Sequence, residues 1–394
     1  PGGPVTIKYL TWWWAEKGRN DAWRAMVEKF HGTQNDVRIE EVGFPFSEYF
    51  QKVMTQVAGG KLDADVLSFS DEIAVRLIKS NQLEPMDPIV DKLGVRDKLL
   101  QPAHGLVTTD GKIHGLVATQ VPYALIYNKE LYDKEGIAKP PATPEEYMEV
   151  AKKVTRRPDQ FGHAGRSTLP EQNGWWQDLT HWVVGYGGVW AKDKKPLATS
   201  EPVLKAVRAY KRMYDEAAPQ GSDASTYRRM AWEGKIVQYI DNSANINILR
   251  SGNPEIYPKI FSAPPPWENR GVVVSPSFVG IYAGSDKKDA ARLWWEFIFN
   301  RDNLPELLEQ ALDIIPAYEG GIREAYVKDL HWASGFQAAK GVVFISTVEG
   351  FEANIAEFRQ IALQKVSEVL TAGKDPELAM KEAQQGLEEL AARV

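Results

Sequence analysis

Tryptophan stands out in this sequence of 394 residues, because it occurs 13 times and mostly in clusters. Three clusters are evident: Trp12–Trp14, Trp175–Trp176 and Trp294–Trp295. Consecutive residues of a strand point to opposite faces, so at least one tryptophan of a cluster is predicted to meet a loop, a cleft or a ligand. The last pair falls in a helical pattern of apolar residues, and we expect both of its tryptophans in the core.

Polar side chains gather close to these aromatic residues. The segment Glu171–Gly174 directly precedes Trp175, and Asp241-Asn242-Ser243 follows the buried-looking strand Ile236–Ile240. A sugar offers apolar C–H faces, which flat rings cover, and hydroxyl groups, which exchange hydrogen bonds with carboxylates, amides and arginines. Covering such a face contributes about 25 cal/mol for each Å² of apolar surface removed from water. The combination favours a carbohydrate-binding site.

The sequence lacks the residues that several other kinds of site require. The sequence has no cysteine, which excludes a disulfide framework, a thiolate zinc site and a cysteine nucleophile. The six histidines are scattered without metal-ligand spacing, and no GxGxxG, Walker A, HExxH or GxSxG motif is present. A formal net charge of −6 argues against nucleic acid, whose binding proteins carry basic stripes. We therefore predict no metal, no cofactor and no catalytic residue.

The clusters need a scaffold, and the first third of the chain predicts one. Val5–Thr11 alternates as a half-buried strand does, and apolar residues of Trp23–Phe30 follow at helical spacing. The alternation continues with a strand at Val37 and Ile39, a helix over Tyr49–Val57, a strand over Asp65–Phe69 and a helix over Ile73–Ile78. This order predicts a mostly parallel sheet with helices on both faces and ligands at the carboxyl ends of the strands.

The rest of the chain predicts further strands and longer helices. Gly115–Val117 and Tyr123–Tyr127 are interpreted as two strands joined through Pro122. Helices are expected over Pro144–Val154, Trp175–Val184, Val203–Glu216, Asp289–Phe299, Phe351–Leu370 and Pro376–Ala392.

The length suffices for two domains, and no run approaches the roughly 18 apolar residues of a membrane helix. No signal peptide is evident, so we expect either a cytosolic protein or the mature form of an exported one.

Several short segments, in a fixed order, resemble those of one protein family. Val5–Trp12 matches an opening strand that ends in an aromatic residue, and Asp65–Phe69 matches a later strand. Thr109–Leu116 is close to a DGK-containing crossover, Leu125–Lys129 to an LYYNK segment, and Gly280–Ala291 to a returning strand and helix. On these segments the chain resembles the bacterial extracellular solute-binding proteins of ABC sugar importers, the family that includes maltose-binding protein.

The resemblance implies an α/β fold of two lobes, the periplasmic-binding-protein fold of type II. Each lobe is then expected to hold a mostly parallel sheet flanked by helices, and the chain to cross the hinge several times. The implied N-terminal lobe is residues 1–117 plus 280–316, and the implied C-terminal lobe is residues 118–279 plus 317–394.

A function is implied as well: the extracytoplasmic substrate-binding component of an ABC importer. Such a protein binds a carbohydrate, with an oligosaccharide favoured, in the cleft between its lobes and delivers it to the transmembrane permease by hinge closure. It is a receptor rather than an enzyme and needs no cofactor. We expect a monomer without a nucleic-acid partner, either free in the periplasm or held at the cell surface as a lipoprotein.

The candidate ligand residues come partly from the clusters and partly from the resemblance. The family often places a polar contact at the position of Glu16 and a hydroxyl-binding carboxylate at that of Asp71. A helix cap explains Asp71 equally well, and an N-cap is the commoner role for a serine such as Ser47. The full set is Trp13, Trp14, Glu16, Ser47, Tyr49, Asp71, Tyr123, Glu171, Trp175, Trp176, Asn242, Asn245, Trp267 and Glu349.

Two alternatives stay open. A glycoside hydrolase also has a tryptophan-lined cleft, and its mechanism needs two carboxyl groups facing one glycosidic bond. The same receptor fold could instead bind a polyamine or a phosphorylated polyol. Phosphate would require arginines or an exposed helix N-terminus, and the arginines kept for that role are Arg19, Arg166, Arg228 and Arg323.

Overall fold

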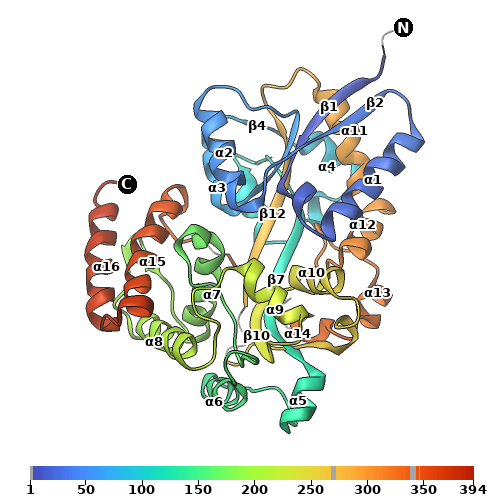
Figure 1. The fold of residues 1–394 in the computed structure, drawn as a ribbon. Coiled ribbons are helices and arrows are strands. Elements are labelled where there is room, and N and C mark those ends of the chain that lie inside the picture. Colours follow the sequence, from blue (N-terminus) through green and yellow to red (C-terminus); the bar gives the residue numbers. More distant parts are fainter. Residues whose placement is uncertain (1–2, 268–271, 338–342, 346) are drawn as a thin grey trace. The chain divides into compact units, whose positions relative to one another are not determined.

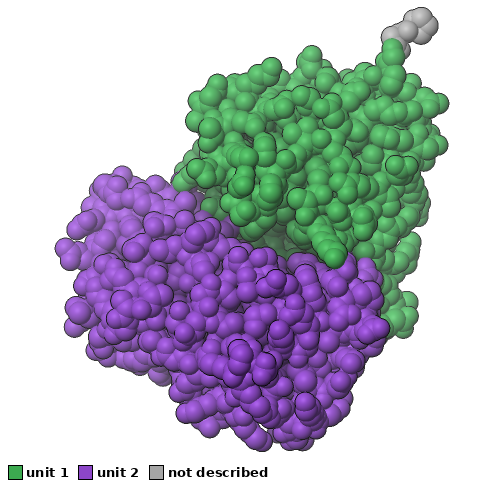
Figure 2. All heavy atoms as spheres, in the orientation of Figure 1, with its two compact units in different colours: residues 1–121, 275–329 green, residues 122–274, 330–394 purple. Residues whose placement is uncertain are grey.

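The computed structural model describes residues 3–267, 272–337, 343–345 and 347–394. The chain forms two compact units, each built from separate stretches of sequence (Figure 2). Unit 1 is Pro1–Val121 with Ser275–Asp329, and unit 2 is Pro122–Val274 with Leu330–Val394. The chain thus passes between units after residues 121, 274 and 329, whereas the boundaries expected from the sequence lie at 117, 279 and 316.

The sheet of unit 1 is built from parallel strands, as the alternating pattern predicts. Strand β1 (Val5–Leu10) lies between β2 (Val37–Val42) and β3 (Val66–Ser70) and runs parallel to both. Strand β12 (Val272–Tyr282) pairs antiparallel with β3, which gives the order β2-β1-β3-β12. The carboxyl ends of β1 and β3 therefore lie at the same edge of the sheet.

Helices cover both faces of this sheet (Figure 1). The β-α-β connections are α1 (Arg19–Thr33) and α2 (Phe46–Ala58), and α3 (Asp71–Lys79) follows β3 directly. Helices α11 (Lys288–Phe299) and α12 (Asn303–Ala311) come from the second stretch of unit 1 and pack against α1. The sheet is thus closed by segments from both ends of the unit's sequence.

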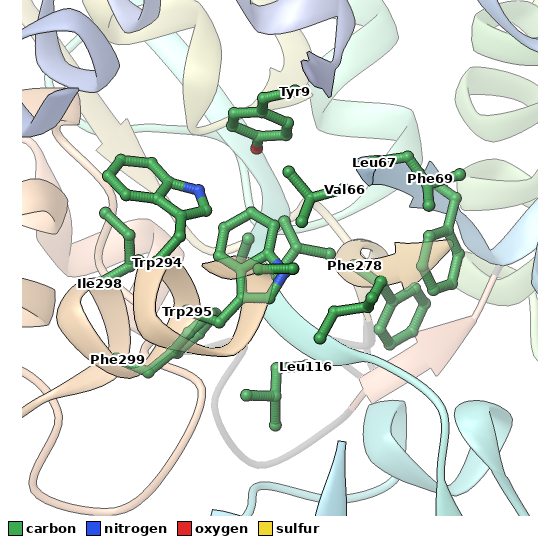
Figure 3. Packing of buried hydrophobic residues seen from close by; sticks show 14 of the residues in the cluster. Tyr9, Val66, Leu67, Phe69, Leu116, Phe278, Trp294, Trp295, Ile298 and Phe299 are labelled. Atoms are coloured by element: carbon green, nitrogen blue, oxygen red, sulfur yellow. The ribbon is translucent and has the colours of Figure 1, made fainter. Parts of the chain in front are cut away.

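Tyr9 lies at the centre of the unit 1 core. Its ring meets Trp14, Trp294 and Trp295 edge-on, with centroids 5.2, 6.4 and 5.3 Å away, and its hydroxyl shares a hydrogen bond of 2.9 Å with Ser68 Oγ. Figure 3 shows the two tryptophans of α11 beside this ring. Both are fully buried, so the prediction that they belong to the core is confirmed.

Unit 2 is organised around the second part of one long strand, β7 (Leu116–Asn128), which begins in unit 1 and enters unit 2 at Pro122. The expectation of two strands joined through Pro122 is wrong, because this residue lies within β7. Proline lacks an N–H group, but the Pro122 carbonyl still accepts a hydrogen bond of 3.0 Å from Ser243 N, so pairing continues past it.

The strands beside β7 correct a second expectation. β10 (Gln238–Asn242) and β11 (Ile260–Ala263) both pair with β7 antiparallel, along the same stretch of that strand. The parallel pattern expected of each lobe therefore holds for the first strands of unit 1 and not for the pairs around β7.

The helices of unit 2 follow the predicted segments closely. α6 is Pro144–Val154, α7 is Gln172–Gly185 and α8 is Glu201–Glu216. The last two, α15 (Ile355–Ala372) and α16 (Pro376–Ala391), run side by side (Figure 1). Helix α7 packs against both α8 and α15, so nearly its whole length is buried.

Shorter elements complete the described chain. The helices are α4 (Asp87–Leu93), α5 (Lys129–Glu135), α9 (Ala224–Trp232), α10 (Ala244–Gly252), α13 (Glu324–Asp329) and α14 (Ala333–Gln337). The strands are β4 (Leu83–Glu84), β5 (Thr108–Thr109), β6 (Lys112–Ile113), β8 (Ala191–Lys192), β9 (Lys195–Pro196) and β13 (Val343–Ile345).

Candidate ligand-binding site

The tryptophan triplet after β1 is packed inside unit 1. Residues Trp12–Ala15 form a 3₁₀ turn, so the alternation of faces that the sequence prediction assumed does not apply, and all three tryptophans are buried. Trp13 stacks on Trp23 with ring centroids 4.9 Å apart, and Trp14 Nε1 donates a hydrogen bond of 3.0 Å to the Tyr9 carbonyl. These contacts give both rings a structural role, and a ligand contact by either stays a prediction.

Glu16 belongs to a buried ion cluster. Its carboxylate accepts a hydrogen bond of 3.0 Å from Arg19 Nε, while Nη1 and Nη2 of Arg19 bind the two oxygens of Asp313 at 2.5 and 3.0 Å. Arg19 and Asp313 are almost inaccessible to solvent. Burial lowers the pKa of Arg19, but the two carboxylates outweigh it and hold that pKa above its usual range.

Tyr49 and Ser47 occupy different surroundings on α2. The Tyr49 hydroxyl is buried between the carbonyl oxygens of Leu10 and Ser68, at 2.9 and 2.7 Å, and therefore ties the helix to the sheet. Burial raises the pKa of this phenol well above its usual range. Ser47 is exposed, and its reading as an N-cap is wrong because the N-cap of α2 is Pro45.

Asp71 lies at the carboxyl edge of the unit 1 sheet. It is the first residue of α3, it is buried, and its Oδ1 accepts a hydrogen bond of 3.1 Å from Glu72 N. The N-cap position itself belongs to Ser70. A carboxylate in the first turn of a helix interacts favourably with the helix dipole.

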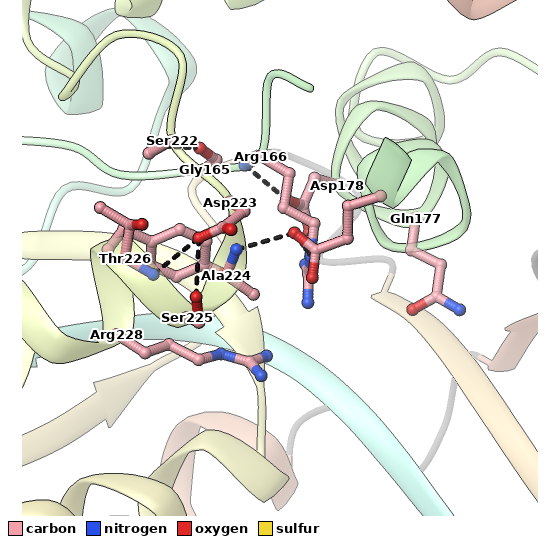
Figure 4. Close-up of polar contacts among 12 residues, drawn as sticks. Gly165, Arg166, Gln177, Asp178, Ser222, Asp223, Ala224, Ser225, Thr226 and Arg228 are labelled. Atoms are coloured by element: carbon pink, nitrogen blue, oxygen red, sulfur yellow. Dashed lines mark hydrogen bonds and ion pairs between the residues drawn. The ribbon is translucent and has the colours of Figure 1, made fainter. Parts of the chain in front are cut away.

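In unit 2, an arginine and an aspartate join a loop to α7. Arg166 donates to Asp178 through its backbone N at 3.1 Å and through Nη1 at 2.9 Å (Figure 4). The guanidinium lies against Gly174, where a Cβ would approach the Arg166 Cδ to 2.7 Å. The glycine thus makes room for the charged group beside the first turn of α7.

A second buried pair lies at the end of β10. Asp241 accepts hydrogen bonds from Arg228 Nε and Nη2, both at 3.1 Å, and from the hydroxyl of Tyr227 at 2.8 Å. Asn245 Nδ2 donates to the same carboxylate at 2.7 Å, and its Oδ1 accepts from the Tyr239 hydroxyl at 2.8 Å. Asn245 was predicted as a ligand residue; both ends of its amide are used within unit 2.

The two aspartates differ in their electrostatic surroundings. Burial raises the pKa of Asp178 to about 6, and the charge of Asp241 adds to that effect while Arg166 opposes it. For Asp241 burial also works against the charge, but Arg228 and Arg166 together hold its pKa below the usual range. Glu171 also lies 3.5 Å from Arg166 Nε, so the cluster contains two arginines and three carboxylates.

Tyr123, within β7, pairs across the sheet with Asn242, the last residue of β10. The Tyr123 hydroxyl donates to Gln177 Oε1 at 2.9 Å, and its ring lies beside the His181 ring at 5.1 Å between centroids. Asn242 Oδ1 accepts a hydrogen bond of 3.1 Å from Ala244 N at the start of α10. The structure brings these two predicted residues together with Asn245 and with the ion cluster.

The two residues of the Trp175–Trp176 pair differ in their contacts. Trp176 stacks on Trp190 with centroids 4.5 Å apart and belongs to the unit 2 core. Trp175 is fully buried, and its Nε1 has no hydrogen-bond partner among the described residues. Glu171, at the N-cap of α7, accepts a hydrogen bond of 2.7 Å from Ala224 N. Of the pair, Trp175 has the donor that a ligand could use.

The two remaining predicted residues are Trp267 and Glu349. The Trp267 ring packs against His181 and Trp182, with centroids 4.8 and 5.5 Å away, and occupies the space left by Gly185. Glu349 is exposed.

Within the described chain, no three His, Asp or Glu side chains are grouped as a metal site would need. None of the described helices combines the length and the apolar character that crossing a bilayer requires.

Comparison with known proteins decides the family. The model of the bacterial extracellular solute-binding protein family matches residues 25–329. This chain belongs to that family. The resemblance inferred from sequence segments is thereby confirmed, and with it the conclusion that the chain is a solute-binding protein and not an enzyme. The glycoside hydrolase alternative is accordingly set aside.

Individual relatives of this solute-binding protein are distant. A binding protein of Brucella abortus (strain 2308) is 22% identical over 354 residues, which cover 86% of this chain and 82% of the relative. An ABC transporter solute-binding protein of Thermotoga lettingae TMO, bound with α-D-tagatose, is 20% identical, with a TM-score of 0.87 over 98% of this chain and 100% of that one. A substrate-binding protein of Listeria monocytogenes, in complex with cycloalternan, has a TM-score of 0.83 at 20% identity over 99% of both chains. The α/β periplasmic-binding-protein fold is thereby confirmed.

Sequence analysis did not predict several residues of the buried polar cluster in this solute-binding protein. Asp178 and Gln177 were not predicted, and Arg166 and Arg228 were considered only for phosphate. Arg166 and Asp178 lie 12 residues apart in a loop and a helix, so no local motif signals their pairing. The signal that did exist was the buried-looking strand that ends at Asp241.

Proposed function

We propose that this solute-binding protein is the substrate-binding component of an ABC importer and that its ligand is a neutral carbohydrate. The family match supports the receptor role. The sugars named for the Thermotoga and Listeria proteins support the ligand class, because both are uncharged polyhydroxy compounds. Trp175 and its polar neighbours in unit 2 have the side-chain types that such a ligand uses.

Charge pairing is the observation that carries the proposal. The four arginines kept for a phosphorylated ligand each form an ion pair within their own unit. The pairs and their distances are Arg19–Asp313 (2.5 Å), Arg166–Asp178 (2.9 Å), Arg228–Asp241 (3.1 Å) and Arg323–Glu309 (2.7 Å).

This pairing discriminates between the ligand classes. A phosphate group needs cationic or N–H donors whose charge is not already neutralised, and removing a carboxylate's partner would leave a buried charge uncompensated. A polyamine meets the same obstacle, because Asp178 and Asp241 are committed to arginines. A neutral polyol adds hydrogen bonds without disturbing either pair, so it fits the cluster better.

Delivery is proposed to occur by hinge closure. A ligand that binds both units favours the closed form in proportion to its extra contacts there. The three chain crossings provide a covalent hinge between the units. The closed form would then be recognised by the permease, with the protein exported to the periplasm or held at the cell surface as a lipoprotein.

A ligand screen tests the proposal. Mass spectrometry of the purified protein identifies a copurified ligand, and thermal-shift assays then compare neutral mono- and oligosaccharides with polyamines and phosphorylated polyols. A neutral sugar at about 100 times its Kd should stabilise the fold by about 2.7 kcal/mol. Stabilisation by a phosphorylated polyol or a polyamine alone would contradict the ligand class. Sugar that is recovered unchanged after incubation serves as the control against hydrolysis.

A further inference from the structure

Two serines occupy the same position in the two units. Ser70 ends β3 and is the N-cap of α3, and Ser243 follows β10 and is the N-cap of α10. An N-cap serine normally accepts a hydrogen bond from an N–H group two or three residues further on. Neither serine does so, since neither side chain makes a capping hydrogen bond.

A neighbouring side chain has taken over part of the capping in each case. Asp71 Oδ1 accepts from Glu72 N at 3.1 Å, and Asn242 Oδ1 accepts from Ala244 N at 3.1 Å. Ser243 has the helical backbone angles φ −62° and ψ −25°, whereas a capping residue has an extended backbone. The two serine hydroxyls are therefore not needed for the helices that they precede.

Both hydroxyls are nevertheless buried. Ser70 is 6% exposed and Ser243 is 0% exposed, and neither Oγ has a hydrogen-bond partner among the residues that the structure describes. A buried hydroxyl without a partner is destabilising, because it has lost its bonds to water and gained none in return. Alanine would serve the free protein better at both positions.

We propose that Ser70 and Ser243 are ligand contacts and that each exchanges a hydrogen bond with a hydroxyl group of the carbohydrate. The inference rests on the proposed function and names residues for it. A serine hydroxyl both donates and accepts, as a sugar hydroxyl does. Each serine follows a strand of its unit's sheet, at the end where ligands of α/β proteins bind. Asp71 and Asn242, predicted from the sequence, lie next to these serines but already bond a helix N–H group.

The test uses Ser70→Ala, Ser243→Ala and a matched control, Ser200→Ala. Ser200 is also an N-cap serine without a capping bond, and its Oγ likewise has no partner in the described structure. It precedes α8 after the β8–β9 hairpin instead of a strand of the main sheet. With the sugar found in the ligand screen, calorimetry should show about three- to tenfold weaker binding for each of the first two variants. Ser200→Ala should bind as the wild type does.

Unfolding of the ligand-free variants distinguishes ligand contact from a structural role. Ser70→Ala and Ser243→Ala should unfold at urea midpoints equal to or above that of the wild type, since each loses an unsatisfied hydroxyl. Unchanged affinity in both variants, or weaker binding accompanied by a lower midpoint, would overturn the inference. If the wild type binds no sugar, the proposed function fails and this inference with it; if it binds and both variants match it, only the inference fails.

Discussion

Asp178 and Asp241 share one buried cluster in unit 2, yet they respond differently to it. Asp241 holds its charge because two arginines and three further hydrogen-bond donors surround it. Asp178 has Arg166 as its main partner, and burial together with the charge of Asp241 raises its pKa to about 6. Asp178 therefore contributes a pH dependence of its own to the stability of unit 2.

We expect the contribution of Asp178 to stability to fall between about pH 4 and about pH 6. An unfolded aspartate titrates near pH 3.9, roughly two units below the value of about 6 in the folded chain. Within this window Asp178 binds more protons in the folded state than in the unfolded state, so its contribution to the free energy of unfolding decreases as pH rises and levels off above about pH 6. The loss is on the order of 2–3 kcal/mol.

Urea unfolding of Asp178→Asn at several pH values measures this effect. The variant leaves Arg166 without its carboxylate and should be less stable at neutral pH. The difference in the free energy of unfolding between variant and wild type should, however, change by about 2–3 kcal/mol between about pH 4 and about pH 6. Asp289→Asn is the control, because that carboxylate is 98% exposed. A difference that stays constant with pH would contradict the assignment.

Single residues were predicted unevenly from the sequence. Residue type and position after a strand indicate Tyr49 and Trp13 as candidate ligand contacts. Residue type does not reveal that the Tyr49 hydroxyl bonds two carbonyl groups or that the Trp13 ring stacks on Trp23. Ser70 and Ser243 carry no signal of their own, since an N-cap serine normally has a partner. Only the surrounding hydrogen bonds distinguish these cases.

At the scale of elements, the first turn of α7 combines a glycine with a buried arginine. Glycine usually weakens a helix by about 1 kcal/mol relative to alanine. At Gly174 the absent side chain is required, because a Cβ would overlap the Arg166 guanidinium and come within 2.7 Å of its Cδ. The local cost of the glycine is thus offset by the ion pair it permits.

Gly174→Ala is expected to destabilise the protein by roughly 1–3 kcal/mol, since overpacking outweighs the gain in helix propensity. The matched variant is Gly32→Ala in α1, where a Cβ would meet nothing within 4 Å. It should stabilise the protein by about 0.5–1 kcal/mol. Thermal and urea unfolding of both variants check the signs. If both substitutions stabilised the fold, the close approach of Arg166 to α7 would be refuted.

Helices with a clear periodic pattern of apolar residues were predicted well. Segments whose conformation depends on tertiary contacts were not. Helix α6 has the predicted bounds, because a Thr143 cap and Pro144 mark its start. The turn Trp12–Ala15 was treated as strand, because side-chain type does not distinguish a strand end from a 3₁₀ turn. The interruption expected at Pro122 was wrong for a similar reason, since the carbonyl of that residue keeps its partner across the sheet.

On the scale of the whole molecule, both units are discontinuous in sequence. Pattern reasoning alone predicted two domains but gave no boundaries; those came from the family resemblance. The expected crossings at 117 and 279 lie near 121 and 274, whereas the third, at 316, lies further from 329. The last crossing follows α13, a six-residue helix that no sequence pattern indicated.

Ligand binding should compact the protein if hinge closure is its mechanism. Small-angle X-ray scattering of the free protein and of the protein saturated with its sugar should show a lower radius of gyration for the complex. A sugar that gives no thermal shift provides the control for contrast and viscosity. Tight binding with an unchanged scattering profile would contradict closure while leaving the receptor role intact.

The ion pair between Arg19 and Asp313 also limits how early the newly synthesised chain can fold. Its two residues lie 294 positions apart, and two of the tryptophans that contact Tyr9, Trp294 and Trp295, come from a helix almost as distant. At roughly 5–20 residues per second, the ribosome adds the later partners about 15 to 60 s after the first strand. Throughout that interval α1 lacks the ion pair of Arg19, and Tyr9 of β1 lacks its aromatic neighbours from α11. A nascent chain of this protein therefore cannot complete its first core before most of its length has been synthesised.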